Sequence, residues 1–230
     1  MNKSVYEYIT SAYDLQYVNL NILECGASDM AIDTEPFRLT NNCYYIEPIP
    51  ESVEYLKQNA PNVNINNVFN YALHNYCGET SFKVSSHGGN SSYNHSQEHT
   101  DELIRYHNAI FKDITVKTIT FKKFIEDKIM TNIDILVLDV EGCESIILES
   151  FKELTTNQFP KIICIECGYE WNEKKQILLD LGYTIDFYGF NNCYASYGEI
   201  NKRTNVIKEF NLANKTFIWY GKTLYTNDLI

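Results

Sequence analysis

Acidic residues and a glycine follow the first apolar runs of this sequence, at positions where they could bind a nucleoside. Gly26 comes directly after the run that ends in Glu24 and Cys25, and Glu47 ends the next run, 21 residues after Gly26. A glycine lets a ligand approach the backbone closely, because it has no Cβ atom. An acid about 20 residues after such a turn can accept hydrogen bonds from both ribose hydroxyls. The spacing therefore predicts a nucleoside site at these two strand ends.

The glycine turn distinguishes between two kinds of nucleoside cofactor. A dinucleotide site requires the pattern G-x-G-x-x-G, whereas residues 26–31 read GASDMA and contain one glycine. Asp29 at this point would also repel a pyrophosphate. A cofactor that ends in an amino acid carries an ammonium group, which acidic neighbours favour. These residues indicate S-adenosylmethionine rather than NAD, and an NAD-dependent oxidoreductase remains a rival interpretation.

Apolar runs and amphipathic segments alternate along the chain. We predict strands at 19–25, 43–48, within 62–73, and at 133–142, 161–167, 183–189 and 215–221, and helices at roughly 29–41, 50–59, 119–128, 143–154 and 171–181. Such alternation is typical of an α/β fold, here a doubly wound, mostly parallel sheet with seven main strands in a single domain of residues 1–230. Ligands of these folds bind beyond the carboxyl ends of the strands.

One segment, from Gly78 to about Lys117, interrupts the alternation. It contains two short strand patterns around a polar stretch that holds a glycine pair and four of the five histidines. Long irregular insertions in compact domains are more often functional than idle. We therefore expect a small hairpin and loop insertion at 78–117 that serves as a lid or a substrate platform.

Composition limits the partners and the location of the protein. The formal net charge is −11, and an acidic chain repels phosphate backbones, so nucleic acid is not expected as a partner. No apolar run reaches the roughly 18 residues that span a membrane, and the N-terminus does not resemble a signal peptide. We expect a cytoplasmic protein without membrane contact whose seven cysteines stay reduced. The Cys164-x-x-Cys167 pair lacks the second pair of ligands that a zinc site needs. The oligomeric state is not predicted.

The order of these motifs resembles the FkbM-type methyltransferases, an S-adenosylmethionine-dependent family with the class I methyltransferase fold. The resemblance covers about residues 20–170 and lies in LECGAS, YYIEPIPESVEYL, NYALHNYCGETSF, HGGNSSY, LDVEGCE and IECG. LDVEGCE together with IEPIPES is its most specific part. The chain departs from the family pattern at Ser28, where asparagine is usual, at Met30, where glycine is usual, and at Val137, where lysine is usual.

The resemblance implies a role for residues at several strand ends. Glu24 and Gly26 would hold the methionine end of the cofactor, Glu47 would accept the ribose hydroxyls, Ala72 and its neighbours would line the adenine pocket, and Asp139 would lie between cofactor and acceptor. The full set of cofactor residues implied in this way is Glu24, Gly26, Ala27, Ser28, Glu47, Pro48, Ala72, Leu73 and Asp139.

Methyl transfer is an in-line displacement, so alignment of the acceptor does most of the catalytic work. A general base helps when the acceptor is a hydroxyl. The candidates are Asp139, Glu166 and His87, and Asp139 ranks first because it ends the strongest apolar run. Asp139, Glu141 and Glu166 could instead bind a divalent cation that orients a diol acceptor, although we favour a site without metal. Glu24, Glu47 and Glu166 could each instead be a partner of a helix dipole or a solvent-facing strand end.

The function that these features favour is O-methylation of a hydroxyl on a sugar or another small molecule. The preference for a sugar is implied by the resemblance alone. One alternative is methylation of a nucleic acid or a protein. Another is a non-catalytic nucleoside-binding module, in which the altered glycine turn has lost affinity for the cofactor.

Overall fold

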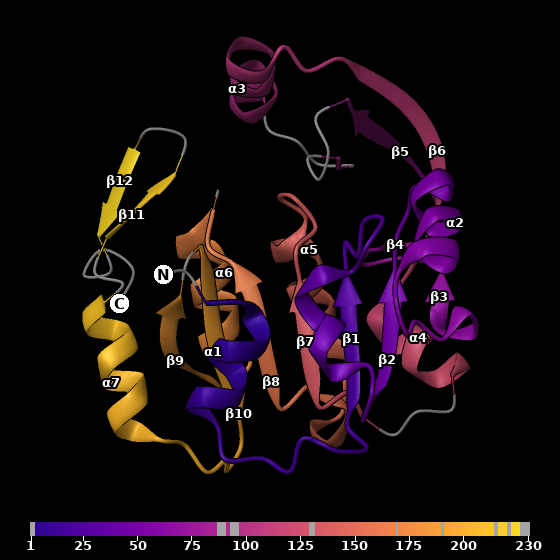
Figure 1. Cartoon of the computed structure of the whole chain (residues 1–230). Coiled ribbons are helices and arrows are strands. Elements are labelled where there is room, and N and C mark those ends of the chain that lie inside the picture. The colour runs from indigo at the N-terminus through magenta and orange to yellow at the C-terminus, as the bar shows by residue number, and fades with distance from the viewer. Residues whose placement is uncertain are drawn as a thin grey trace.

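The computed structural model shows a central sheet of seven strands with helices on both faces (Figure 1). It describes residues 3–86, 91–92, 97–128, 132–168, 170–189, 191–213, 216–219 and 222–225. In spatial order the strands are β3 (Val68–Phe69), β2 (Asn42–Ile46), β1 (Asn21–Cys25), β7 (Ile135–Leu138), β8 (Ile162–Glu166), β10 (Asn192–Tyr197) and β9 (Tyr183–Gly189). The first five are parallel, and β10 runs antiparallel to both its neighbours. The predicted α/β class, with a doubly wound and mostly parallel sheet, is confirmed.

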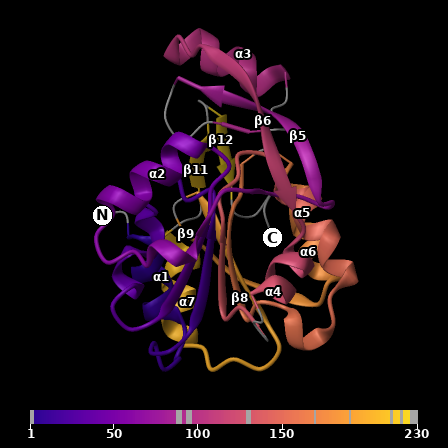
Figure 2. The same cartoon turned by 90° about the vertical axis from the view of Figure 1, so that its right-hand side faces the viewer.

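Helices cover the two faces of the sheet (Figure 2). One face packs against α1 (Val5–Ala12), α2 (Pro50–Asn59) and α7 (Thr204–Ala213), and the other against α4 (Phe121–Asp127), α5 (Glu144–Ser150) and α6 (Trp171–Asp180). Short 3₁₀ helices lie at η2 (Ile65–Asn67), η3 (Phe151–Glu153) and η4 (Thr156–Gln158). In the described part of the chain, no helix has the length and apolar character needed to cross a membrane.

Each parallel strand contributes to two cores, because successive side chains point to opposite faces of a sheet. Ile22 of β1 packs in the cluster that contains Ile9 of α1, whereas its neighbour Leu23 packs in the cluster that contains Phe124 of α4. All four residues of β7 are buried. A strand covered on both faces reads as a continuous apolar run, which explains why the run at 133–142 predicted β7.

The insertion forms a second sheet above the carboxyl ends of the central strands (Figures 1 and 2). This sheet has the order β4-β6-β5 and consists of β4 (Ala72–Leu73), β6 (Phe111–Ile119) and β5 (Gly78–Ser85), with α3 (Gln97–His107) between β5 and β6 in sequence. β5 and β6 pair along an antiparallel ladder from Gly78 to Ser85. Since β4 follows β3 closely in the chain, the insertion begins at the edge of the central sheet.

The strand predicted at 215–221 does not belong to the central sheet. Its residues form β11 (Thr216–Trp219), which pairs with β12 (Lys222–Tyr225) in a separate two-stranded sheet. The seventh strand of the central sheet is β10 instead. Its sequence, NCYASY, lacks a run of branched apolar residues, and it forms a strand because it pairs with β8 and β9.

The α-helix predicted at 29–41 is also wrong. Only the 3₁₀ helix η1 (Ile32–Phe37) forms there. Pro36 lies inside it and has no backbone N–H group to donate, and Ala31 directly before it has a φ angle of 46°. A proline at this position and a left-handed residue at the start both oppose an α-helix.

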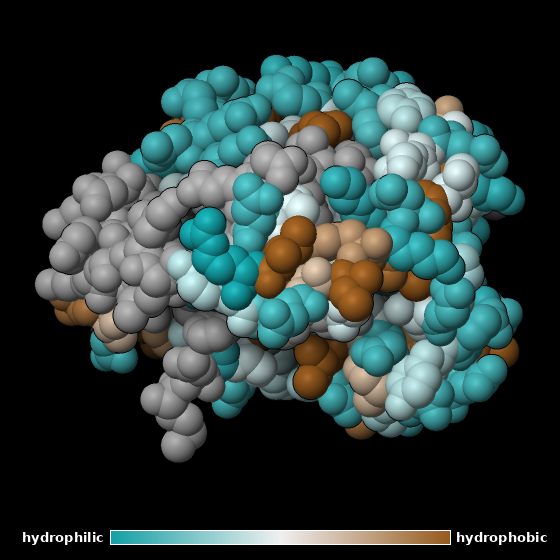
Figure 3. Space-filling view, turned by 90° about the horizontal axis from the view of Figure 1, so that it is seen from above, coloured by the Kyte–Doolittle hydropathy of each residue, from teal (hydrophilic) through white to brown (hydrophobic). Residues whose placement is uncertain are grey.

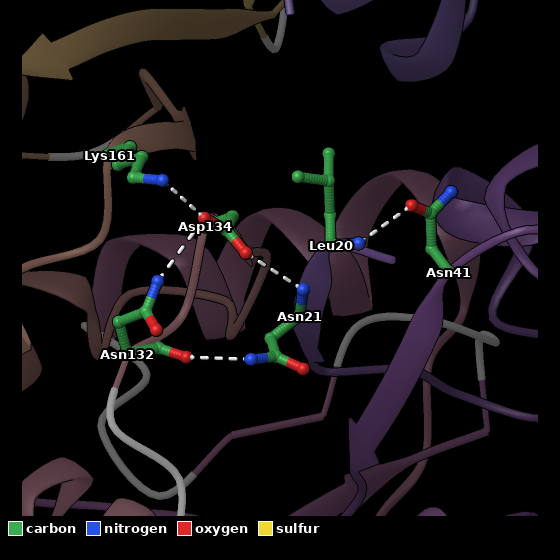
Figure 4. A network of polar contacts seen from close by, with 6 residues as sticks. All are labelled: Leu20, Asn21, Asn41, Asn132, Asp134 and Lys161. Atoms are coloured by element: carbon green, nitrogen blue, oxygen red, sulfur yellow. Dashed lines mark hydrogen bonds and ion pairs between the residues drawn. The ribbon is translucent and has the colours of Figure 1, made fainter. Parts of the chain in front are cut away.

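The amino ends of the central strands are joined by the amino-end network, which consists of Asn21, Asn132, Asp134 and Lys161 (Figure 4). Asp134 Oδ2 accepts a hydrogen bond of 2.9 Å from the Asn21 backbone N–H, and its Oδ1 lies 2.7 Å from Lys161 Nζ. The Asn132 amide donates to the same Oδ1 at 3.2 Å. One buried carboxylate therefore links the starts of β1, β7 and β8.

Candidate functional site

A cavity of about 680 Å³ lies at the carboxyl ends of β1, β2 and β7. The order of the strands reverses here, because β2 and β3 lie on one side of β1 and β7 and β8 on the other. The lining comes from residues 26–33, 46–49, 71–73 and 139–141, from Glu24 and Ser52, and from Phe82, Val84, Ser85 and Ser91 of the insertion. Figure 3 looks down on this end of the molecule and shows hydrophobic residues surrounded by hydrophilic ones.

The backbone conformation and the close packing at position 26 both require a glycine. Its φ angle is +81°, and a Cβ atom at this position would lie 1.7 Å from the carbonyl oxygen of Asp139. The turn is held between neighbouring strands, because the Gly26 N–H donates to Ile46 O at 3.0 Å and the Asp139 N–H donates to Cys25 O at 3.1 Å. The prediction assigned the glycine to the approach of a ligand, and the structure adds that the turn after β7 already approaches it closely.

The sequence predicted an α-helix over residues 29–41. In the structure, the loop after Gly26 does not lead into the N-terminus of an α-helix. Ser28 and Ala31 have φ angles of 52° and 46°. The guanidinium of Arg38 fixes this shape, since its Nη2 donates to Met30 O at 2.7 Å and also to Ala31 O. Arg38 is buried, and its Nε donates to Tyr45 Oη at 3.1 Å. Sequence reasoning missed Arg38, because no motif surrounds it and its carbonyl partners are set by the loop conformation.

Glu47 is buried and lies beside the Gly26 turn. Its Oε2 accepts from the Ser28 backbone N–H at 2.8 Å, and its Oε1 accepts from the Ile49 backbone N–H at 2.9 Å. Burial raises the pKa of Glu47 to about 7, against the lowering effect of the two amides, and the charge of Asp29 raises it further. A carboxylate accepts about four hydrogen bonds, so the two oxygens keep capacity for hydroxyl groups in the cavity.

Glu24 is the second buried carboxyl group of the cavity. Its Oε2 accepts from Thr34 Oγ1 at 2.5 Å. Burial raises the pKa of Glu24 to about 8, and the charge of Asp33 adds to this, while Thr34 and Arg38 act in the opposite direction. A cationic ligand group would favour its ionised form.

Asp139 and Glu141 line the same cavity from the turn after β7. Burial and the charge of Glu144 raise the pKa of Asp139, while burial and the charge of Asp139 raise the pKa of Glu141. Glu166 ends β8 outside the cavity lining, and burial together with Asp139 raises its pKa as well. Perturbed carboxyl groups of this kind are common at functional sites.

A family model described as "Methyltransferase FkbM domain" matches residues 24–201 of the chain. The chain belongs to the FkbM methyltransferase family. Among solved structures, a precorrin-6y C5,15-methyltransferase from Geobacter metallireducens GS-15 aligns with a TM-score of 0.43 and 11% sequence identity, over 85% of this chain and 87% of that chain. The search of curated proteins gave no match.

The predicted cofactor residues of this FkbM domain all line one cavity. They are Glu24, Gly26, Ala27, Ser28, Glu47, Pro48, Ala72, Leu73 and Asp139. Of the candidate bases, Asp139 lies in the cavity, Glu166 lies outside its lining, and His87 lies outside the described residues. The roles of all these residues stay predictions.

The described residues of the FkbM domain include no group of three or more His, Cys, Asp or Glu side chains placed to hold a metal ion. The set Asp139, Glu141 and Glu166 therefore gains no geometric support as a metal site. Cys164 and Cys167 are buried free thiols, and burial raises the pKa of both well above the usual range. High thiol pKa values disfavour nucleophilic or redox chemistry at this pair.

Proposed function

We propose that this FkbM methyltransferase uses S-adenosylmethionine to methylate a hydroxyl group of a sugar or another small uncharged molecule. The observation that carries the proposal is the meeting of all nine predicted cofactor residues around one cavity at the reversal point of strand order. Class I methyltransferases and other doubly wound folds bind nucleosides at this kind of position.

The residues of the cavity fit the parts of the cofactor. Glu47 would accept hydrogen bonds from the ribose hydroxyls, beside the turn that its carboxylate already orders through Ser28. Pro48, Ala72 and Leu73 supply apolar surface for the adenine ring. The buried carboxyl group of Glu24 would pair with the ammonium group of the methionine end, which would compensate the cost of its burial.

S-adenosylmethionine supplies the activated methyl group when it is bound. The protein's contribution is to align the acceptor with that group and to exclude water. A carboxylate oxygen of Asp139 would accept the proton of the acceptor hydroxyl, because Asp139 lies in the cavity and its raised pKa brings it closer to the range of a general base.

The charges of the cavity favour an acceptor without negative groups. Six of the lining residues are acidic, namely Glu24, Asp29, Asp33, Glu47, Asp139 and Glu141, and among the described lining residues there is no lysine, arginine or histidine. A phosphate or carboxylate on the acceptor would be repelled. This supports a small uncharged acceptor over nucleic acid, in agreement with the net charge of −11. We also keep the cytoplasm as the proposed location, since reducing conditions would preserve the seven free thiols.

A second candidate is a non-catalytic nucleoside-binding module. The left-handed φ angle of 52° at Ser28 favours it, because asparagine, which is usual in the family pattern, adopts this conformation more readily than serine. A module of this kind would have lost affinity for the cofactor and would transfer nothing.

Calorimetric titration of the full chain with S-adenosylmethionine, S-adenosylhomocysteine and NAD tests the cofactor. We expect both sulfur nucleosides to bind and NAD not to bind, and stabilisation by NAD alone would overturn the proposal. A screen of sugars, phenols and other hydroxylated molecules with methyl-labelled S-adenosylmethionine then tests transfer. Failure of the chain to bind either sulfur nucleoside or NAD would favour the module. Transfer that EDTA abolishes and Mg²⁺ restores would show that a cation takes part.

A further inference from the structure

A buried ion pair lies behind the acidic residues of the cavity. Lys174 of α6 and Glu144 of α5 have side chains that are 1% and 0% exposed, and Lys174 Nζ lies 2.9 Å from Glu144 Oε2. Fully buried lysine and glutamate side chains are rare and costly unless they are paired and hydrogen-bonded. Neither residue lines the cavity.

Both members of the pair also bind backbone groups at the ends of strands. Glu144 Oε2 accepts from the Gly142 N–H at 3.1 Å, and its Oε1 accepts from the Val140 N–H at 3.3 Å. Lys174 Nζ donates to the carbonyl oxygen of Glu166 at 3.2 Å. The pair thus connects the turn after β7 with the end of β8, the segments that carry two of the three candidate bases, Asp139 and Glu166.

The turn after β7, which Glu144 holds, has an energetically unfavourable backbone conformation. Glu141 has a φ angle of 56° and Gly142 one of 94°, so two consecutive residues are left-handed. A non-glycine residue in this region costs on the order of 1 kcal/mol and persists only when its surroundings fix it. The two backbone N–H groups that donate hydrogen bonds to Glu144 belong to Val140 and Gly142, the residues on either side of Glu141.

The charge of Lys174 acts on the same residues. It lowers the pKa of Asp139, Glu141 and Glu166, against burial and the repulsion between the acids. Burial acts to lower the pKa of Lys174, but the charge of Glu144, the hydrogen bond to Glu144 and the charge of Glu166 together raise it. Lys174 therefore stays cationic beside the acidic turn.

We propose that Lys174, through its ion pair with Glu144, is a positioning residue that fixes the turn carrying Asp139 and the end of β8 for methyl transfer. This rests on the proposed function, because it assigns the transfer step to these two strand ends. The predicted cofactor residues Gly26 and Glu47 are held by other hydrogen bonds, to Ile46 O and from the Ser28 N–H, rather than by the pair itself.

The test compares full-length variants by hydrogen exchange. Lys174→Met removes the cation, and Glu144→Gln/Lys174→Met removes both charges, so that no unpaired charge stays buried. Lys161→Met is the matched control, because it breaks the ion pair with Asp134 at the amino ends of the strands. We expect Lys174→Met to raise amide exchange over residues 139–144 about tenfold while residues 26–30 stay near the parent, and the double variant to raise it by a smaller factor. Lys161→Met is expected to leave both segments unchanged.

Binding and turnover separate positioning from general destabilisation. The dissociation constant of Lys174→Met for S-adenosylhomocysteine should stay within about threefold of the parent. With an acceptor from the screen, kcat should fall roughly tenfold to a hundredfold while KM for S-adenosylmethionine changes little.

Unchanged exchange over 139–144 in both pair variants would overturn the proposal, as would an equal rise over residues 26–30. If Lys174→Met does not fold, the double variant decides by the same measurements. Failure of the parent to bind either sulfur nucleoside would instead overturn the proposed function, and the exchange data would still decide whether the pair holds the turn.

Discussion

The charges of buried acidic groups are compensated to different degrees at the two ends of the parallel strands. At the amino ends, Asp134 is satisfied by a cation and by two N–H donors within the amino-end network. At the carboxyl ends, five acids share a small region in which Lys174 and Arg38 are buried cations, namely Glu24, Glu47, Asp139, Glu141 and Glu166.

The difference agrees with the proposal that the carboxyl ends form the functional site while Asp134 stabilises the amino ends. Acids whose charges are not compensated destabilise the unliganded protein, and such groups are common at binding and catalytic sites. A bound cation such as a sulfonium or an ammonium group would compensate them. The comparison gives four expectations, in order of decreasing effect.

Asp139→Asn is expected to lower kcat by roughly 10² to 10⁴, which is the contribution of a positioned general base. The dissociation constant for S-adenosylmethionine should change little, because Glu47 and Glu24 remain. The matched change at the other end, Asp134→Asn, should cost about 1–3 kcal/mol of unfolding free energy and leave kcat near the parent. Steady-state kinetics and urea denaturation measure both. Equal kcat values for the two variants would remove the functional contrast between the ends.

Gly26→Ala is expected to cost about 3 kcal/mol or more in stability and to abolish cofactor binding, because the new Cβ would meet the carbonyl oxygen of Asp139. Gly198→Ala is the control at the amino end. Gly198 has a φ angle of +73° but no atom within 4 Å of the added Cβ, so only backbone strain of about 1 kcal/mol is expected. Thermal denaturation and calorimetric titration distinguish the two. Retained binding by Gly26→Ala would contradict the close approach of the turns.

The unliganded protein is expected to become less stable as the pH rises from about 4.5 to about 8. The pKa of Glu24 is raised from 4.5 to about 8 and that of Glu47 to about 7, so the folded chain binds more protons than the unfolded chain in this window. Glu24→Gln should reduce this loss of unfolding free energy by roughly 2 kcal/mol. Urea denaturation at several pH values measures how the free energy of unfolding changes with pH. Stability that increases with pH through this window would be the opposite of the expected result.

Glu47→Gln is expected to weaken binding of S-adenosylmethionine about tenfold, because an amide accepts hydroxyl hydrogen bonds less strongly than a carboxylate and only through one oxygen. Glu51→Gln, in the exposed first turn of α2, is the control and should have no measurable effect. Calorimetry at pH 8, where Glu47 is mostly ionised, measures the affinity of each variant and of the parent for S-adenosylmethionine. Equal affinity of Glu47→Gln and the parent would rule out the ribose contact.

The sequence by itself determined the features that are local or periodic. The alternation of apolar and amphipathic segments predicted the sheet class, and α2 forms over the predicted range 50–59 because Pro50 starts it and Ala60 precedes a second proline. The strand-end acids were found because parallel strands end at a common edge, which brought Glu24, Glu47 and Asp139 to one cavity.

The tertiary structure alone decided the features that depend on partners distant in the chain. β10 pairs between β8 and β9 without a strong apolar pattern, and Arg38 orders a loop whose carbonyl groups only the fold directs toward it. Lys174 and Glu144 meet across 30 residues of sequence, and nothing in the composition of either helix marks them as buried. Burial and electrostatic coupling are properties of the assembled structure, because they depend on which elements exclude water around a group.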